Sequence, residues 1–366
     1  MDPQAAAPLR FVQIGDLHLT DAGQRNHIDL GRIVDELNRN VGHAIDFVYL
    51  PGDNADDGTA AQFRLAREQL DRLLPPTHII PGDHDFKPRS LRDFHAVLDV
   101  PDLPYAIDAG GCRCLFLDVV SAGTGGPDFR LGVTQSAWLE RELAHARNVG
   151  RPAVVFMHTY PDDLGEEAHL IARMIDASSA VLVSMGHTHY NEIAHDGRTI
   201  YAATRSTGQI EEGPVGFSFA AVDQGSVSWR FKPLNSPWPF VMVTRPADRR
   251  LALADPHPVA TAIRASAWGG VPIDRAEFRI DHGRWQPMTG GDRGLFTAAL
   301  DTSRQSFQIQ VRVIDRDGAE GSDAIEVGPP ARICEPSGSD AGAIGPWPER
   351  HILGTQLGPN RNGRKW

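Results

Sequence analysis

The segment Phe47-Val48-Tyr49-Leu50-Pro51-Gly52-Asp53 is a run of four apolar residues that ends in a tight turn carrying a carboxylate. The same pattern occurs at Phe11–Ile14, which ends at Gly15-Asp16, and at His78–Ile80, which ends at Pro81-Gly82-Asp83. Short apolar runs bounded by Gly and Pro are typical of buried strands. We therefore interpret each run as a strand followed by a polar loop.

Segments with helical spacing separate these runs. Apolar faces are predicted over residues 30–41, 63–73 and 134–146, the last with Thr134 as N-cap and with Leu139, Leu143 and Ala146 buried. Further strands are predicted at 105–107, 114–117, 153–157 and 180–185. This alternation is typical of an α/β fold. Open α/β sheets bind ligands beyond the carboxyl ends of their strands, which is where the polar residues cluster.

From Tyr190 the pattern changes to hairpins, with predicted strands at 192–194, 199–202, 217–222 and 227–231. An α/β segment followed by β-hairpins predicts two sheets that pack face to face and are flanked by helices. Pro233–Pro239 is interpreted as a linker, and later strands at 276–280, 296–300, 307–314 and 324–327 predict a small all-β sandwich. The expected domains are 1–232, a linker at 233–240, a β domain at 241–330 and an irregular tail at 331–366. Trp347, Ile352, Leu353 and Leu357 would pin that tail to the body.

The composition narrows the class of partner. Of 366 residues, 41% are hydrophobic and 23% charged, and the net charge is −11, which argues against a general nucleic-acid or membrane-surface binder. No apolar stretch reaches the roughly 18 residues of a membrane span, and residues 1–8 show no signal-peptide pattern. We expect a cytoplasmic protein, although a chain trimmed of a leader would look the same. Among Cys112, Cys114 and Cys334, the first two are interpreted as buried strand residues in preference to a metal-binding thiol pair.

Five short segments, each after an apolar run, carry the side chains of a candidate metal site. Seven potential ligands result: Asp16, His18, Asp53, Asp83, His158, His187 and His189. Imidazole and carboxylate without cysteine suit Mn²⁺, Fe or Zn²⁺. Seven side chains are too many for one tetrahedral ion and about right for two ions that share a bridging carboxylate.

This series of motifs resembles the calcineurin-like metallophosphoesterase superfamily, and in spacing and size its bacterial class III cyclic-nucleotide phosphodiesterase branch. The resemblance covers about residues 9–232. It implies a four-layer αββα sandwich with a dinuclear site at the strand ends. It also implies that Asp16, His18 and His189 hold one metal, that His158, His187 and position 83 hold the other, and that Asp53 bridges them.

One position departs from the family pattern, which has Gly-Asn-His where this chain has Gly82-Asp83-His84. With three carboxylates and one hydroxide, two divalent ions would form a formally neutral cluster. Three consequences are open: weaker anion binding, a preference for a more highly charged ion such as Fe³⁺, or compensation by nearby Arg and Lys.

The charges predict a mechanism. Two metals lower the pKa of a bridging water so that hydroxide can attack phosphorus, and the leaving alkoxide needs a proton, for which His84 is the candidate donor. Asp85 would either orient His84 or cap the following turn, the second being favoured. Asn54, Asp56 and Asp57 are interpreted as capping and loop residues that can still reach the rim of the pocket.

The predicted function is a dinuclear metal-dependent phosphodiesterase that acts on small phosphodiesters, with 3′,5′-cyclic nucleotides as candidates. The alternatives are a phosphomonoesterase or nucleotidase on the same site and a non-catalytic scaffold. Tyr160, Arg205 and His27 are further candidates for substrate contact, and His195 is expected to be exposed. The β domain resembles immunoglobulin-like accessory modules, which implies a positioning or homodimerisation role; its Trp285 is expected in the core.

Overall fold

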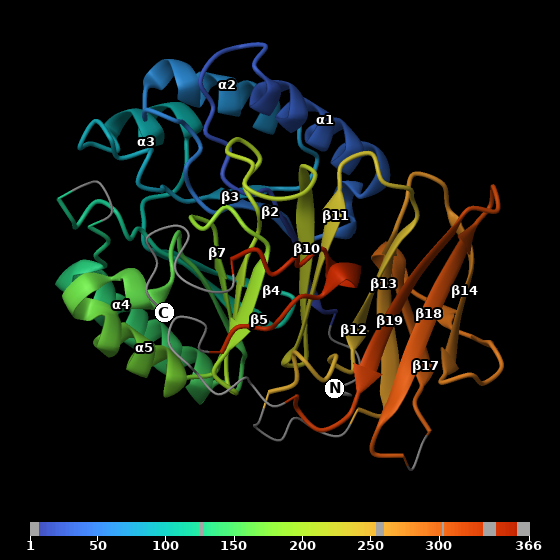
Figure 1. The fold of residues 1–366 in the computed structure, drawn as a ribbon. Coiled ribbons are helices and arrows are strands. Elements are labelled where there is room, and N and C mark those ends of the chain that lie inside the picture. The colour runs from blue at the N-terminus through green and yellow to red at the C-terminus, as the bar shows by residue number, and fades with distance from the viewer. Residues whose placement is uncertain (1–6, 125–127, 254–259, 302–303, 332–341, 357–366) are drawn as a thin grey trace.

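Two β-sheets lie face to face at the centre of the N-terminal part of the molecule (Figure 1). The structure is a computed structural model that describes residues 7–124, 128–253, 260–301, 304–331 and 342–356. The first sheet has the order β11-β10-β1-β2-β3 and the second the order β4-β5-β6-β7-β9-β8. Their strands are β1 Leu9–Gln13, β2 Phe47–Leu50, β3 Thr77–Ile79, β4 Tyr105–Ala109, β5 Cys112–Phe116, β6 Ala153–Phe156, β7 Ala180–Met185, β8 Glu192–His195, β9 Ile200–Ala203, β10 Gly216–Asp223 and β11 Ser226–Pro233.

Helices form the two outer layers (Figure 1). On one side lie α1 Arg25–Asn40, α2 Ala60–Leu70 and α3 Arg92–Leu98, and on the other α4 Gly132–Asn148 and α5 Ala168–Asp176. The short 3₁₀ helices are η2 Gly42–Ala44, η3 Pro161–Asp163, η4 Gly165–Glu167, η5 Asp292–Gly294 and η6 Pro348–Arg350. Helix α1 buries Leu30, Ile33, Val34 and Leu37, the face its spacing predicts. The αββα sandwich expected from the sequence is confirmed.

Aromatic rings fill the space between the sheets. Phe116 and Phe156 stack with their centroids 4.5 Å apart, and Phe11 meets Phe156 edge to face at 5.2 Å. Such pairs add to the stability that apolar burial already provides. The two sheets are therefore held in a fixed relation, which keeps the loops at their ends in register.

His78 on β3 belongs to this aromatic layer and gives a pH prediction. It stacks on Phe116, and its Nδ1 lies 2.9 Å from the Tyr105 hydroxyl. Burial lowers the pKa of His78 to about 4. The unfolded chain takes up this proton near pH 6.5 and the folded chain only near pH 4, so stability should fall as the pH drops through that interval, by about 3 kcal/mol in full. Urea unfolding of the wild type and of His78→Phe should show this loss in the wild type only; parallel pH curves would contradict it.

The C-terminal part contains two four-stranded antiparallel sheets, ordered β12-β13-β17-β16 and β15-β14-β18-β19, around a separate apolar core. Their strands are β12 Phe240–Arg245, β13 Ala262–Trp268, β14 Ile273–Ile280, β15 Gln286–Pro287, β16 Thr289–Gly290, β17 Leu295–Ala299, β18 Phe307–Asp315 and β19 Glu320–Val327. Trp268 stacks on Phe219 of β10 at 4.3 Å, and Arg264 pairs with Asp223 at 2.7 Å. The sandwich expected from the sequence is present and packs directly on β10 of the first sheet.

Several local expectations were wrong. Thr134 lies inside α4, whose first backbone N–H groups donate instead to the Glu167 carboxylate. His195 is buried, and its backbone N–H donates to the Gly342 carbonyl at 2.9 Å, because a later segment of the chain covers its strand. Trp285 contacts the guanidinium groups of Arg279 and Arg312, whose Cζ atoms lie 4.6 and 4.3 Å from its ring centroid, and it is not part of the sandwich core.

Of the remaining local expectations, some are correct, one is wrong and others concern residues that the structure does not describe. Cys112 and Cys114 are buried free thiols, as favoured, whereas Cys334 lies outside the described residues. Of the tail anchors, Trp347 and Ile352 are buried, Leu353 is exposed, and Leu357 lies outside the described residues.

Candidate metal centre

All seven ligands predicted from the sequence lie in loops at one end of the two sheets. Asp16 and His18 follow β1, Asp53 follows β2, Asp83 follows β3, His158 follows β6, and His187 and His189 follow β7. Strands β1, β2 and β3 are parallel neighbours, as are β5, β6 and β7, so their carboxyl ends meet at common edges. The structure groups the side chains as Asp16, His18, Asp53 and His189 on one side and Asp83, His158 and His187 on the other.

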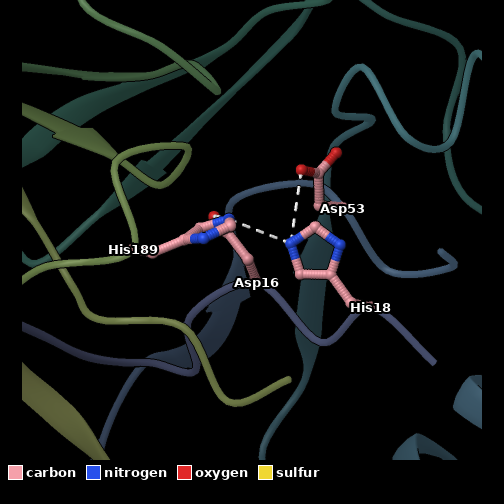
Figure 2. Close-up of side chains that lie close together, drawn as sticks. All are labelled: Asp16, His18, Asp53 and His189. Carbon is pink, nitrogen blue, oxygen red and sulfur yellow. Dashed lines mark hydrogen bonds and ion pairs between the residues drawn. The ribbon is translucent and has the colours of Figure 1, made fainter. Parts of the chain in front are cut away.

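The first group converges on a single point, as Figure 2 shows. His18 Nε2 lies 3.0 Å from His189 Nε2 and 3.6 Å from Asp53 Oδ2. His189 Nε2 is also 3.6 Å from Asp16 Oδ2. Two imidazole nitrogens and two carboxylate oxygens that face one another at these distances can hold a transition metal.

The second group shares Asp53 with the first. His158 Nε2 lies 3.2 Å from Asp83 Oδ1 and 3.6 Å from Asp53 Oδ2, the same oxygen that faces His18. His187 Nδ1 lies 3.4 Å from Asp83 Oδ1. Asp53 therefore lies between the two groups, where a bridging carboxylate is expected.

Hydrogen bonds fix the orientation of the ligands. His158 Nδ1 lies 2.7 Å from the Pro51 carbonyl, which can only accept, so Nδ1 carries a hydrogen and Nε2 points into the site. The backbone N–H of His187 donates to Asp16 Oδ2 at 2.7 Å, and that of His84 donates to Asp53 Oδ1 at 2.9 Å. The ligand set is thus held in place by backbone groups of neighbouring loops.

The loops adopt a costly backbone conformation at the site. His18, Asp53, His187 and His189 have φ values of 43°, 52°, 64° and 64°, in the left-handed region that side chains disfavour. Strained residues of this kind cluster at functional sites. The neighbouring glycines are also required, since a Cβ on Gly82 would lie 2.2 Å from Asp53 Oδ1 and one on Gly186 would lie 2.1 Å from Asp16 Oδ1.

The electrostatics of these residues fit bound cations. Asp16 Oδ1 is buried and has no hydrogen-bond partner among the described residues. Burial, reinforced by the charge of Asp83 and Asp16, raises the pKa of Asp53 well above its usual value, although His158 opposes the shift. Burial and the neighbouring His189 and His84 lower the pKa of His18. A positive ion would stabilise both the buried carboxylates and the neutral imidazole.

His84 lies beside the two groups without belonging to either. Its ring meets that of His18 edge to face at 4.4 Å, and its side chain is 23% exposed. His84 Nδ1 lies 2.9 Å from the Asp56 carbonyl and 3.1 Å from Asp56 Oδ1, so it is Asp56 that orients the ring. His187, Asp83 and His84 are all partly exposed, whereas Asp16, Asp53 and His158 are buried, so the site opens on the side of His84.

The two interpretations of Asp85 are now resolved. Its carboxylate accepts hydrogen bonds from the backbone N–H groups of Gly82, Asn54 and Ala55 and does not contact His84. Asp85 therefore holds the turn, as favoured from the sequence. Asn54 donates to the Ile80 carbonyl, and Asp57 interacts with Gln62 at the start of α2, so these two also have local structural roles.

The other candidates for substrate contact lie away from the opening. Arg205 is buried against Glu212, and Tyr160 is buried with its hydroxyl 3.4 Å from Glu192. His27 interacts with Gln69 on α2. Two residues missed from the sequence do contact the site. Phe129 meets the His187 ring edge to face at 4.9 Å, and Gln209 Nε2 lies 3.2 Å from His18 Nδ1. No motif marks either residue, because each comes from a loop without a distinctive pattern.

Fold and site together are those of a metallophosphoesterase whose residues can hold a metal cluster, and the comparisons agree. The family model for calcineurin-like phosphoesterases matches residues 9–191, and the chain belongs to this family. The chain is 31% identical over 159 residues to glycerophosphodiester phosphodiesterase GpdQ of Enterobacter lignolyticus (strain SCF1), a match that covers 39% of this chain and 56% of that protein. The chain thus spans little more than half of that relative.

Two further proteins are similar over a longer stretch. The 3′,5′-cyclic adenosine monophosphate phosphodiesterase CpdA of Escherichia coli (strain K12) is 26% identical over 249 residues, which cover 63% of this chain and 86% of that protein. A dimetal phosphatase from Danio rerio has the same fold, with a TM-score of 0.52 and 15% identity over 62% of this chain and 96% of that one. Within the described residues, no helix is both long enough and apolar enough to cross a bilayer.

Proposed function

We propose that the chain is a phosphodiesterase that uses two metal ions to hydrolyse small phosphodiesters. The observation that carries the proposal is the pair of ligand groups that meet at Asp53 Oδ2, with His84 at the open side. Asp16, His18 and His189 would hold one ion, Asp83, His158 and His187 the other, and Asp53 both. Mn²⁺ and Fe are the ions we expect, with Zn²⁺ as an alternative, because all ligands are imidazoles or carboxylates.

The chain's own residues then have defined tasks. When bound, the ions supply the Lewis-acid charge that activates water and stabilises the phosphoryl oxygens. The attacking water loses one proton to solvent as its oxygen bonds to phosphorus, the bond from phosphorus to the leaving oxygen breaks, and that oxygen needs a proton. His84, whose Nδ1 is held by Asp56, is the side chain positioned to donate this proton. Phe129 packs edge to face on the His187 ring and so helps to orient it.

The charge of the site favours diesters over monoesters. Three carboxylates and the bound hydroxide leave two divalent ions formally neutral, so a monoanionic diester adds less excess negative charge to the site than a dianionic monoester does. Among the described residues, no Lys or Arg side chain lies at ion-pair distance from Asp16, Asp53 or Asp83. The basic side chain near the site is Lys87, and it pairs with Asp56 and Asp57 instead. The contacts of these carboxylates therefore do not support the third consequence considered for Asp83, in which nearby Arg and Lys compensate its extra negative charge.

A paired assay tests this function. Metal-free protein is reconstituted with Mn²⁺, Fe or Zn²⁺ and offered a bis(aryl) phosphate and a mono(aryl) phosphate, then 3′,5′-cyclic AMP and a glycerophosphodiester. We expect faster hydrolysis of the diesters. A clear preference for the monoester would overturn the assignment in favour of a phosphomonoesterase. Homodimerisation through the C-terminal sheets stays a separate prediction, which light scattering of the intact chain would test.

Asp83→Asn tests the charge argument. The amide keeps a ligand oxygen but removes one negative charge from the cluster, and a unit charge about 4 Å away contributes about 4 kcal/mol at an effective dielectric constant near 20. We expect two ions per chain, a lower share of Fe³⁺ relative to Mn²⁺ when both are supplied, and at least about tenfold tighter inhibition by inorganic phosphate. Elemental analysis and inhibition kinetics measure these changes; unchanged metal preference and unchanged inhibition would refute the argument.

A further inference from the structure

The loop of residues 204–212, which follows β9, forms hydrogen bonds with the first ligand group. Ser206 Oγ donates to the Asp16 carbonyl at 2.8 Å, and the Gly208 N–H donates to the same oxygen at 3.0 Å. The Ser206 N–H donates to the His189 carbonyl at 3.3 Å, and the Gln209 side chain lies beside His18. This loop therefore contacts all three ligands that are specific to the first group.

A buried ion pair supports the loop in turn. Arg205 and Glu212, at 1% and 6% exposure, pair at 3.1 Å. The backbone N–H of Arg205 donates to Asn191 Oδ1, and that of Asn191 donates to Glu212 Oε1, both at 2.9 Å. Since Asn191 follows His189 by two residues, the ion pair and the ligand loop form one connected network.

Residues 342–356, here called the C-terminal strap, form hydrogen bonds with the members of this network. The His351 carbonyl accepts from Arg205 Nη2 at 2.7 Å and from Asn191 Nδ2 at 3.0 Å, and the Thr355 hydroxyl donates to Glu212. The strap also pairs with β8, through the Ile344 N–H to the Ile193 carbonyl at 2.8 Å, and Trp347 is buried against the body. Figure 1 shows this segment in red, running across the catalytic sheets.

The second ligand group has different supports. His158 is held by the Pro51 carbonyl and by Asp83, and the turn that carries Asp83 is held by Asp85. The hydrogen bonds between the strap and the loops near the metal centre reach Asn191, Ile193, His195, Arg205 and Glu212, all on the side of His189. The strap is also fixed to β19, where the Arg350 side chain donates to Asp323. The network is therefore asymmetric with respect to the two groups.

We propose that the C-terminal strap is a positioning element for one half of the metal centre, the half formed by Asp16, His18 and His189. This inference rests on the proposed dinuclear site. The strap fixes Asn191 and the Arg205–Glu212 pair, these fix the loop of residues 204–212, and that loop fixes the backbone of Asp16 and His189. Ligands kept in a left-handed backbone conformation need such external support.

The test measures Mn²⁺ affinity in chains that keep only one ligand group. His158→Ala leaves the first group, and His189→Ala leaves the second. Each is made in the intact chain, in a chain that ends at residue 341 and so lacks the strap, and in a control chain that ends at residue 356 and keeps it. Circular dichroism checks folding, and calorimetric titration of the metal-free proteins with Mn²⁺ gives the Kd.

We expect loss of the strap to weaken Mn²⁺ binding at least tenfold in the His158→Ala chain and less than twofold in the His189→Ala chain, with no change in the control. Equal weakening in both, or none in either, would overturn the inference. If the shortened chain does not fold, the same comparison of Mn²⁺ binding is made in full-length His158→Ala and His189→Ala chains that also carry Arg205→Met and Glu212→Met. This double substitution removes both charges of the pair together. Failure of the intact wild-type chain to bind Mn²⁺ would refute the metal centre itself.

Discussion

We expect Asp53→Asn to abolish tight binding of the metal pair and to lower kcat/KM by about 10³-fold or more. Lewis-acid stabilisation is worth several kcal/mol, and each ~1.4 kcal/mol is a tenfold change in rate. Asp53 Oδ2 faces both His18 and His158, so its replacement by a neutral amide weakens both ligand groups at once. Elemental analysis after reconstitution and kinetics with a bis(aryl) phosphate measure the two losses.

The same substitution should stabilise the metal-free protein. Asp53 is 1% exposed and lies near the carboxylates of Asp83 and Asp16, an arrangement that destabilises the folded chain without cations. Asn keeps the acceptor for the His84 N–H and tolerates the φ of 52°. Thermal unfolding in the presence of a chelator should give a higher Tm for Asp53→Asn than for the wild type, and added Mn²⁺ should raise only the wild-type Tm. A variant that is less stable without metal would mean that Asp53 has a structural role.

We expect His84→Ala to lower kcat by about 10²- to 10⁴-fold for substrates with poor leaving groups, the range that removal of a positioned proton donor produces. The loss should be much smaller for a p-nitrophenyl ester, whose leaving group needs no proton. His84 contacts Asp56 and the face of His18 but belongs to neither ligand group that meets at Asp53. The variant should therefore keep two ions per chain.

The matched control for His84 is Asp56→Asn, which leaves the imidazole in place and removes the carboxylate beside Nδ1. It should lower kcat for poor leaving groups by less than His84→Ala does, again with two ions bound. If His84→Ala empties the metal site, or if its effect is the same for all leaving groups, then His84 is not the proton donor.

The ligands could be predicted from the sequence because their position depends on a local pattern. Each follows a short apolar run, and parallel strands bring their carboxyl ends together whatever the rest of the chain does. Asp53 and His187 are far apart in sequence, yet both lie at the ends of strands whose neighbours are parallel. The fold follows from the same regularity.

What could not be predicted depends on contacts between distant segments. Thr134 resembles a helix N-cap, but Glu167, more than thirty residues away, supplies the carboxylate that α4 needs. His195 belongs to a hairpin that would be exposed if the strap did not cover its edge. Gln209 reaches His18 only because the loop after β9 folds back under β1. Helix α5 was missed, although the apolar spacing of Leu170, Ile171, Met174 and Ile175 would have indicated it.

The most direct test of the central claim is a titration of the metal-free wild-type chain with Mn²⁺, followed by elemental analysis and electron paramagnetic resonance. Two equivalents should bind, and their resonance should show the spin coupling of ions about 3.5–4 Å apart that share a bridging ligand. One isolated Mn²⁺ per chain, or none, would contradict the account.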